Sequence, residues 1–301
     1  MISNSEFVSA AEHLGFIKTF FLPADDIPTD YGKLISSPKA ILPGAKTLIL
    51  LIMPYELAEN TGSREGVIST YYRASQKAYK GTKELTDILT KAGAHAVYNA
   101  NIPLKSAIVK YNIGIQRLNS LTYIDGIGSA FHIQNIITDN KFELSSLSAG
   151  FSPVDCSKCE RCVKACPGKA ISDTGYIDPD RCLRSVSEQK EIPKEVESLL
   201  GNRLLGCDVC QMVCPHNKVY GSERSFTYPL KKLLMGDLGD LPDIIGPNLA
   251  RKTRMICKAC VLAANNERTD LLPLLEELAG SKDKFVLAAA KRAIDRLEEK
   301  Q

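Results

Sequence analysis

The chain has 301 residues, of which 44% are hydrophobic and 24% charged, and a formal net charge of +3. These proportions are ordinary for a soluble globular protein, and so small a charge does not by itself indicate a nucleic-acid partner. No stretch approaches the ~20 apolar residues of a membrane span, and the N-terminal residues lack the basic start and apolar core of a signal peptide. We therefore expect a cytoplasmic protein of about two or three domains, with no membrane partner.

The first segment, residues 1–150, is predicted to be an α/β domain. Residues 47–53 form a continuous apolar run between Pro43-Gly44 and Pro54, which is typical of a strand buried on both faces. Hydrophobic periodicity and turn residues predict the remaining elements. These are helices over residues 1–16, 71–93 and 106–112, strands over 95–98 and 131–138, and turns at Gly126-Ile-Gly128 and Asp139-Asn140.

The second segment, residues 151–220, holds eight of the ten cysteines in two ferredoxin-type runs. The runs are Cys156-x2-Cys159-x2-Cys162-x3-Cys166-Pro167 and Cys207-x2-Cys210-x3-Cys214-Pro215, with a lone Cys182 between them. A [4Fe–4S] cluster takes four thiolates, so eight cysteines supply two clusters, and in two-cluster ferredoxins the fourth cysteine of a run ligates the other cluster. We assign Cys156, Cys159, Cys162 and Cys214 to one cluster, and Cys166, Cys182, Cys207 and Cys210 to the other.

Two other interpretations of these cysteines are zinc ribbons and disulfides. Zinc sites usually show paired C-x2-C knuckles, and ten cysteines in a chain without a secretion signal favour a reducing compartment and metal binding. Two clusters mean that the protein moves electrons one at a time.

The third segment, residues 221–301, is predicted to be helical. Residues 248–264, 270–278 and 285–297 are apolar at helical spacing, which resembles HEAT-type repeats. Cys257 and Cys260 share one helix face. They are either two metal ligands or, the interpretation that we favour, a pair of core cysteines.

The order of the three segments resembles the epoxyqueuosine reductase family. The residues that carry the resemblance are Leu42-Pro-Gly-Ala-Lys46, Met53-Pro-Tyr55, Tyr71-Tyr-Arg73 and, most specifically, residues 201–217, which read Gly-Asn-Arg-Leu-Leu-Gly-Cys-Asp-Val-Cys-Gln-Met-Val-Cys-Pro-His-Asn. The resemblance implies an α+β multidomain protein: a nitroreductase-like corrinoid-binding domain over residues 1–150, a two-cluster ferredoxin domain over 151–220 and HEAT-like helices over 221–301.

The resemblance also implies an activity and its partners. The family uses base-off cobalamin and two [4Fe–4S] clusters to remove the epoxide oxygen in the last step of queuosine synthesis on tRNA. We therefore expect an oxidoreductase with a flavodoxin- or ferredoxin-type electron donor and tRNA as a partner. The corrinoid pocket that it implies is lined by Tyr55, Tyr72, Tyr98, Ser120, Thr122 and Asp208.

The chain departs from the family pattern on the substrate side. The proton-donating Asp of the family falls at Tyr98 or Asn99, and its Asp-Tyr-His segment is Lys77-Ala-Tyr79. Of its glycine-rich loop only Gly114 and Ser120 remain, in residues 112–120. The chain is thus predicted to be a divergent member that acts on epoxyqueuosine or on another small electrophile. Tyr98 is either the replacement acid or a strand residue.

Two further functions stay open. One is an electron-transfer protein of the ferredoxin type with an attached α/β domain, serving a partner enzyme. The other is a corrinoid-binding or corrinoid-reactivating protein without a substrate of its own. The chain has no Asp-x-His-x-x-Gly segment that would give cobalt a lower histidine ligand, which suits both base-off cobalamin and a protein without cobalamin.

Overall fold

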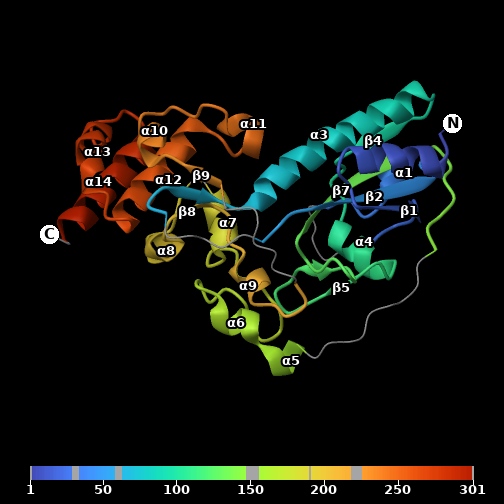
Figure 1. The fold of residues 1–301 in the computed structure, drawn as a ribbon, viewed down its shortest axis with the longest axis horizontal. Coiled ribbons are helices and arrows are strands. Elements are labelled where there is room, and N and C mark those ends of the chain that lie inside the picture. The colour runs from blue at the N-terminus through green and yellow to red at the C-terminus, as the bar shows by residue number, and fades with distance from the viewer. Residues whose placement is uncertain are drawn as a thin grey trace. The chain divides into compact units, whose positions relative to one another are not determined.

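Two compact units make up the protein in a computed structural model, which describes residues 2–28, 34–57, 63–146, 156–189, 191–217 and 226–299. The first unit comprises residues 1–55, 74–158 and 216–218, and the second comprises 56–73, 159–215 and 219–301. Figure 1 labels their helices and strands. The segment boundaries expected at residues 150 and 220 do not coincide with these units, because a short segment near residue 66 pairs with strands of the second unit.

A four-stranded sheet forms the centre of the first unit, in the order β1-β2-β7-β4 and antiparallel throughout. Its strands are β1 (Lys18–Pro23), β2 (Thr47–Pro54), β7 (Phe131–Thr138) and β4 (Ala96–Tyr98). Alternate residues of β2 face two different hydrophobic clusters: Leu48, Leu50 and Ile52 lie in one, and Ile49, Leu51 and Met53 lie in the other. The prediction that this run is buried on both faces is confirmed.

Helices cover both faces of this sheet. α1 (Asn4–His13) and α3 (Thr70–Lys91) contribute to one cluster, and α4 (Leu104–Lys110) contributes to the other, while α2 (Pro38–Ile41) is a single turn. Next to α4 lies a small hairpin of β5 (Ile115–Gln116) and β6 (Thr122–Tyr123). The predicted helices, strands and turns of this segment are therefore found, with ends shifted by a few residues.

The second unit contains a three-stranded sheet that the sequence did not predict. β3 (Gly66–Ile68) lies between β8 (Arg203–Leu205), to which it is parallel, and β9 (Phe226–Tyr228), to which it is antiparallel. Each of these strands is three residues long, which is too short for an alternating pattern to stand out in the sequence.

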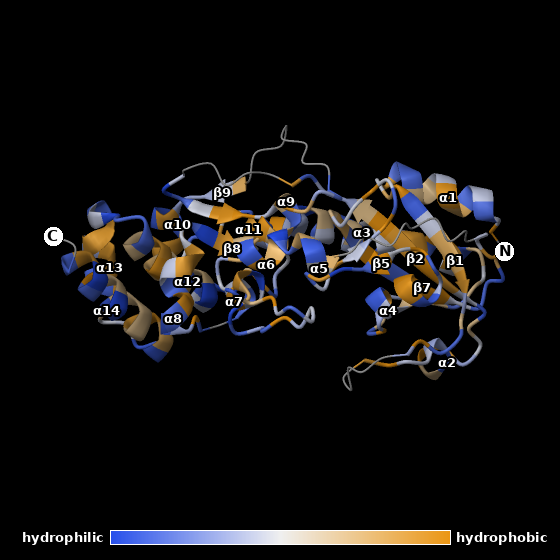
Figure 2. Ribbon diagram, turned by 90° about the horizontal axis from the view of Figure 1, so that it is seen from below, coloured by the Kyte–Doolittle hydropathy of each residue, from blue (hydrophilic) through white to orange (hydrophobic). Residues whose placement is uncertain are grey.

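Helices supply most of the second unit's core. α12 (Lys252–Asn265) is buried from Met255 to Ala264, and both of its cysteines lie in the core, as predicted. The other helical elements follow in chain order: α5 (Cys156–Cys159, which starts in the first unit), α6 (Arg161–Ala165), α7 (Leu183–Glu188), α8 (Lys194–Glu197), η1 (Ser198–Leu200), α9 (Val209–Met212), α10 (Leu230–Leu234), α11 (Leu241–Ile245), η2 (Thr269–Leu271), α13 (Leu272–Leu278) and α14 (Lys284–Glu298). In Figure 2 the apolar residues of α12, α10 and β8 mark this core.

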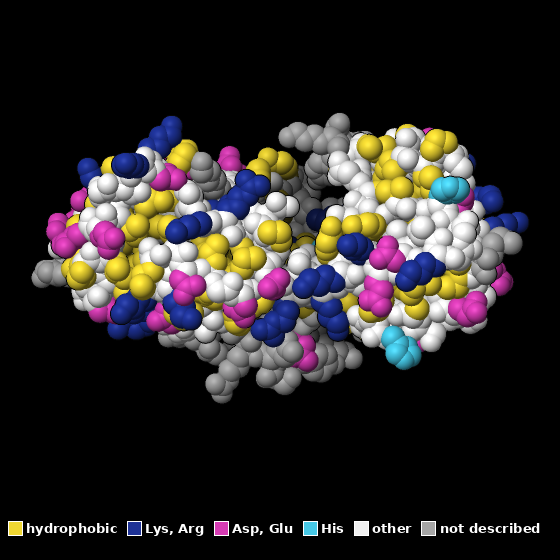
Figure 3. Space-filling model, turned by 90° about the horizontal axis from the view of Figure 1, so that it is seen from above, with side chains coloured by type: hydrophobic (Ala, Val, Ile, Leu, Met, Phe, Trp, Pro, Cys, Tyr) yellow, Lys and Arg dark blue, Asp and Glu magenta, His cyan; other side chains and the backbone are white. Residues whose placement is uncertain are grey.

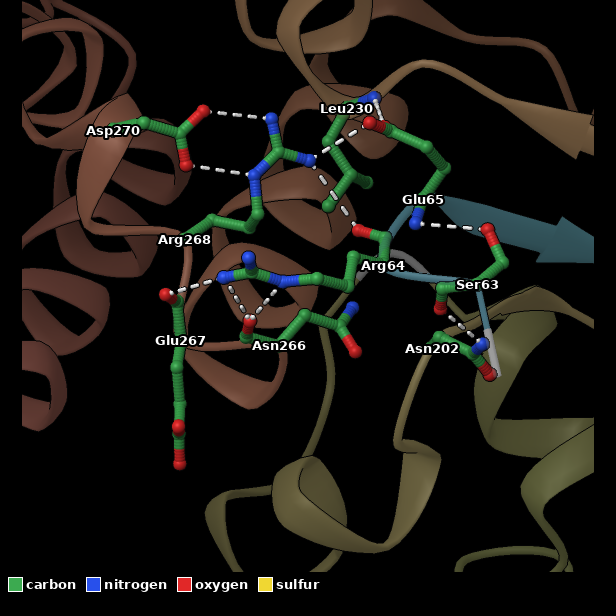
Figure 4. Close-up of polar contacts among 9 residues, drawn as sticks. All are labelled: Ser63, Arg64, Glu65, Asn202, Leu230, Asn266, Glu267, Arg268 and Asp270. Atoms are coloured by element: carbon green, nitrogen blue, oxygen red, sulfur yellow. Dashed lines mark hydrogen bonds and ion pairs between the residues drawn. The ribbon is translucent and has the colours of Figure 1, made fainter.

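Two arginines fasten the chain just before β3 to the end of α12 (Figure 4). Arg64 Nη2 donates to the carbonyl oxygens of Asn266 (3.0 Å) and Glu267 (2.8 Å), which lie at the C-terminal end of that helix. Arg268 Nη1 donates to Glu65 Oε1 (2.8 Å), and Glu65 Oε2 accepts from the backbone N–H of Leu230 (2.6 Å) at the start of α10. Basic side chains commonly donate to the last carbonyl groups of a helix in this way. These contacts hold the three-residue strand β3 in place beside α12.

The surface carries charges of both signs, as the small net charge suggests. On the face drawn in Figure 3, Lys and Arg side chains are interspersed with Asp and Glu. Among the described residues, no helix is both long and apolar enough to span a membrane.

Candidate functional site

The cysteines of the ferredoxin-type runs lie on short helices and on the loops that join them. Cys162 lies in α6, Cys166 caps its C-terminus, Cys182 precedes α7, and Cys210 lies in α9. Helices α6 and α9 pack against each other, so the two runs meet although they are distant in sequence. All eight side chains are half-buried, and none of the ten cysteines, all described, forms a disulfide.

Electrostatic coupling indicates which thiols are neighbours. Burial raises the pKa of the Cys210 thiol, and the nearby Cys207, Asp208, Cys182 and Cys162 raise it further. Burial likewise raises the pKa of Cys207, with smaller contributions from Asp208 and Cys182. Cys182, Cys207 and Cys210, which are assigned to one cluster, therefore lie near one another, and Cys162, which is assigned to the other cluster, lies near Cys210 as well.

Such buried thiols become thiolates only when bound cations compensate their charge, which the irons of a cluster do. A backbone hydrogen bond also suits Cys166 as a cluster ligand: the N–H of Ala170 donates to Cys166 Sγ at 3.3 Å. Among the described residues, no three His, Cys, Asp or Glu side chains are grouped to hold a single metal ion. A [4Fe–4S] cluster instead distributes its thiolates over four irons.

Two of the predicted cofactor residues, Tyr72 and Asp208, both lie near Ser69 and the loop that precedes Cys207. Gly206 has a φ of +88°, and a Cβ there would lie 2.7 Å from Ser69 Cβ and 3.0 Å from Tyr72 Cε2. Only glycine allows this approach, which brings the start of α3 against the loop that precedes Cys207. Ser69 Oγ then donates to Asp208 Oδ2 at 2.5 Å.

Both side chains are fixed by further contacts. Asp208 Oδ1 accepts from Gln211 Nε2 at 2.8 Å, so both carboxylate oxygens are oriented. The Tyr72 hydroxyl donates to Glu188 Oε1 at 2.7 Å, and burial raises the pKa of this phenol well above its usual value. Tyr72 is 2% exposed and belongs to the hydrophobic core. Its hydroxyl is thus already engaged within the protein.

Tyr98, the predicted catalytic residue, lies at the end of β4 in the first unit. Its hydroxyl is 3.5 Å from that of Tyr79 in α3. This hydrogen bond, followed by partial burial, raises the pKa of Tyr98 above its ordinary value. The phenol therefore keeps its proton at neutral pH. Asn99, the other position that matches the family's Asp, has a φ of +50° and turns the chain after the strand.

The remaining predicted residues of the first unit divide between the two faces of the sheet. Tyr55 and Tyr98 both border the hydrophobic cluster formed by α1 and α3. Ser120 and Thr122 belong to the β5–β6 hairpin, which packs with α4, a helix of the other cluster. Thr122 is 4% exposed, so it is a core residue of the hairpin.

Sequence reasoning missed Arg117, in the turn of this hairpin. Arg117 is 7% exposed, its Nη1 lies 3.8 Å from Cys156 Sγ, and its guanidinium lies 5.0 Å from the centre of the Tyr123 ring. Its Nε is buried without a hydrogen-bond partner among the described residues. The only signal in the sequence was a charged residue inside the altered glycine-rich segment.

A cavity of about 240 Å³ lies beside Arg117. It is lined by Arg117, Tyr123, residues 124–128 and His216. Burial lowers the pKa of His216, and the charge of Arg117 lowers it further. The wall is held by Asn217, whose Oδ1 accepts from the backbone N–H of Ser129 at 2.7 Å. Gly128, in the predicted turn, has no room for a side chain because Asn217 lies against it.

Comparison with known proteins shows what the chain is similar to. Residues 155–217 match the model of the 4Fe-4S double cluster binding domain. The protein named epoxyqueuosine reductase of Aliivibrio fischeri is 35% identical over 113 residues, which are 36% of this chain and 29% of that protein. The one of Lactococcus garvieae is 27% identical over 295 residues, covering 87% of this chain and 82% of its own length.

The chain is thus similar in sequence to proteins named epoxyqueuosine reductase. A crystal structure of epoxyqueuosine reductase with an epoxyqueuosine-modified tRNA stem loop has a TM-score of 0.78 and 21% identity, covering 97% of this chain and 89% of that one. The fold is thus shared over nearly the whole chain. The alignment with the Aliivibrio fischeri relative spans less than a third of that relative's length.

Proposed function

We propose that this protein is an iron–sulfur reductase that uses cobalamin to remove the epoxide oxygen from the queuosine precursor in tRNA. The observation that carries the proposal is the set of eight cysteines in a double cluster domain, within a chain related to the epoxyqueuosine reductases over most of its length. Localisation in the cytoplasm and a flavodoxin- or ferredoxin-type donor belong to the same proposal.

The reaction fixes what the protein must supply. Removing an epoxide oxygen breaks two C–O bonds, forms a C=C bond and releases water, so it consumes two electrons and two protons. Two clusters hold these two electrons one at a time. A bound cobalamin would supply a strongly reducing cobalt, and the protein would supply orientation and protons.

The chain's residues fit a corrinoid in part. Asp208 lies next to a cluster ligand, with both oxygens oriented by Ser69 and Gln211. The buried Nε of Arg117 is a donor without a partner among the described residues, beside a cavity, and the amide side chains of a corrinoid are acceptors. Tyr55 and Ser120 are further proposed contacts in the first unit, whereas Tyr72 and Thr122 are core residues, each within its own unit.

Tyr98 is the proposed proton donor. An acid that donates to a developing alkoxide must hold its proton at the working pH, and the raised pKa of Tyr98 satisfies this condition. A carboxylic acid in the same place would need burial to raise its pKa. The substitution changes the volume and polarity of the site, so the native substrate is either epoxyqueuosine or a related electrophile.

The test begins with anaerobic protein, reconstituted clusters and added cobalamin. We expect the visible spectrum to show bound corrinoid, and an epoxyqueuosine-containing tRNA stem loop to be converted to queuosine, measured by mass spectrometry of its nucleosides. Clusters without corrinoid binding would identify an electron-transfer protein instead. Corrinoid binding with no turnover of any electrophile would identify a corrinoid-handling protein.

The role of Tyr98 is tested in the same assay. Tyr98→Phe should retain cluster content and cobalamin affinity and lower turnover by about 10²–10⁴-fold, the usual contribution of a general acid. Tyr176→Phe is the matched control, because Tyr176 is 67% exposed. Unchanged turnover in Tyr98→Phe would make Tyr98 a structural strand residue. An inactive wild type together with an active Tyr98→Asp variant would show that the native substrate is different.

A further inference from the structure

The contact between Arg117 and Cys156 joins a buried cation to a proposed cluster ligand. Arg117 Nη1 donates to Cys156 Sγ over 3.8 Å, a long bond of the kind that sulfur makes. Both residues belong to the first unit. The contact is therefore a property of that unit alone.

Several features fix the guanidinium in this position. The backbone N–H of Arg117 donates to the carbonyl of Leu121 (3.0 Å), and its carbonyl accepts from Ser120 (2.8 Å), which closes the hairpin turn. The guanidinium lies 5.0 Å from the centre of the Tyr123 ring, within the range of a cation–π contact. The Tyr123 hydroxyl in turn accepts from Asn119 Nδ2 at 2.9 Å. Because the guanidinium is held firmly, it need not move when a nearby cluster accepts an electron.

A hydrogen bond to a cluster sulfur and a nearby positive charge both favour the reduced cluster, which carries one more negative charge. Burial strengthens both effects, because water screens a 7% exposed guanidinium poorly. The other cluster has only neutral counterparts among the hydrogen bonds described: Cys166 accepts from the backbone N–H of Ala170, and Cys207 accepts from that of Val209. Arg203 acts on Cys207, but its Nη1 is engaged with the carbonyl of Leu200.

We propose that Arg117 is a positioning residue that raises the reduction potential of the cluster ligated by Cys156 above that of the second cluster. The inference rests on the proposed cluster ligation. It means that the first electron delivered to the protein resides on the Cys156 cluster. A positively charged side chain in a turn thus decides the order in which the two clusters fill.

The experiment is a redox titration of the anaerobic, cluster-loaded protein, followed by electron paramagnetic resonance. Arg117→Met keeps the bulk of the side chain and removes its charge and donor. We expect the midpoint potential of one cluster to shift to a more negative value and that of the other to stay unchanged, with full iron and sulfide content. Lys110→Met is the matched control, because it removes an exposed positive charge from the same unit and should leave both potentials unchanged.

The assignment can be checked with the Cys182→Ser variant, which is expected to keep only the Cys156 cluster. Adding Arg117→Met to it should reproduce the shift in the single remaining signal. Unaltered potentials in fully loaded Arg117→Met would overturn the proposal. If that variant loses the cluster, Arg117→Gln is titrated instead, and loss of the cluster from both would make Arg117 structural and equally overturn it. A wild type that holds no iron would refute the proposed function, which is a different result.

Discussion

Glu197 is a buried carboxylate on which two arginines of the C-terminal helix converge. Its side chain is 5% exposed, and those of Arg292 and Arg296 are 30% and 26% exposed. Arg292 reaches Glu197 Oε1 at 3.0 Å through both Nε and Nη2, and Arg296 Nη1 lies 3.5 Å from Oε2. Asn265 joins the group by donating to the Glu197 carbonyl at 2.8 Å. Glu197 thereby links α8 to α14 through its carboxylate and to α12 through its backbone carbonyl.

We expect Glu197→Gln to destabilise the second unit. Removing one partner of a fully buried ion pair costs about 3–5 kcal/mol because the other charge is left uncompensated. Here water partly screens the two arginines, so we expect about 2–3 kcal/mol. For a domain of this size each kcal/mol lowers Tm by about 2–4 °C, which gives a fall of about 4–12 °C.

The assay is anaerobic thermal unfolding of the cluster-loaded protein, followed by circular dichroism at the helical band. Glu195→Gln is the matched control, because Glu195 lies in the same helix and is exposed. It should change stability by less than about 0.5 kcal/mol. Equal Tm values for the two variants would refute the reasoning. Combining Glu197→Gln with Arg292→Met should cost less than the sum of the single changes, since the second removes a charge that the first left unpaired.

Two further predictions follow from other side chains. Anaerobic wild-type protein should contain about eight irons and Cys182→Ser about half as many, by iron and sulfide analysis; retention of both clusters would show that our ligand pairing is wrong. Burial lowers the pKa of Lys258 from its ordinary 10.5 to about 7. The charge of Arg254 lowers this pKa further, and that of Glu188 partly opposes the shift. The folded protein then binds fewer protons than the unfolded one between these values, so its stability relative to Lys258→Met should rise with pH across that window and be lowest below pH 7. Parallel Tm curves for wild type and Lys258→Met from pH 6.5 to 9.5 would contradict this.

The sequence predicted the long elements of the fold because their hydrophobic patterns are long. The strand at Phe131–Thr138 and the helix at Thr70–Lys91 were found nearly to the residue. β1 was missed, since Lys18–Pro23 begins with a charged residue and only two of its six residues are fully buried. β3, β8 and β9 were missed because their pairing depends on residues far away in the chain and not on a local pattern.

The candidate site also divides into features that a local sequence pattern predicts and features that depend on residues far apart in the chain. The cysteine spacing alone predicted two iron–sulfur clusters, and the model of the 4Fe-4S double cluster binding domain matches the same residues. The association of Tyr72 with Asp208 depends on Gly206, whose missing side chain allows a close approach that no local pattern reveals. Arg117 was overlooked because its role depends on a contact with the Sγ atom of Cys156, which is distant from it in the sequence. That the first segment is nitroreductase-like and that the third is HEAT-like both stay predictions.

The position of β3 in its sheet has a consequence for biosynthesis. Gly66–Ile68 is made early, whereas its partner Arg203–Leu205 follows five of the eight cysteines of the ferredoxin-type runs, and its other partner Phe226–Tyr228 follows all eight. Non-local pairing of this kind is slow, because loop-closure entropy is lost before the contacts form. The nascent chain therefore presents its cysteines before the sheet closes, which leaves an interval in which clusters can be inserted.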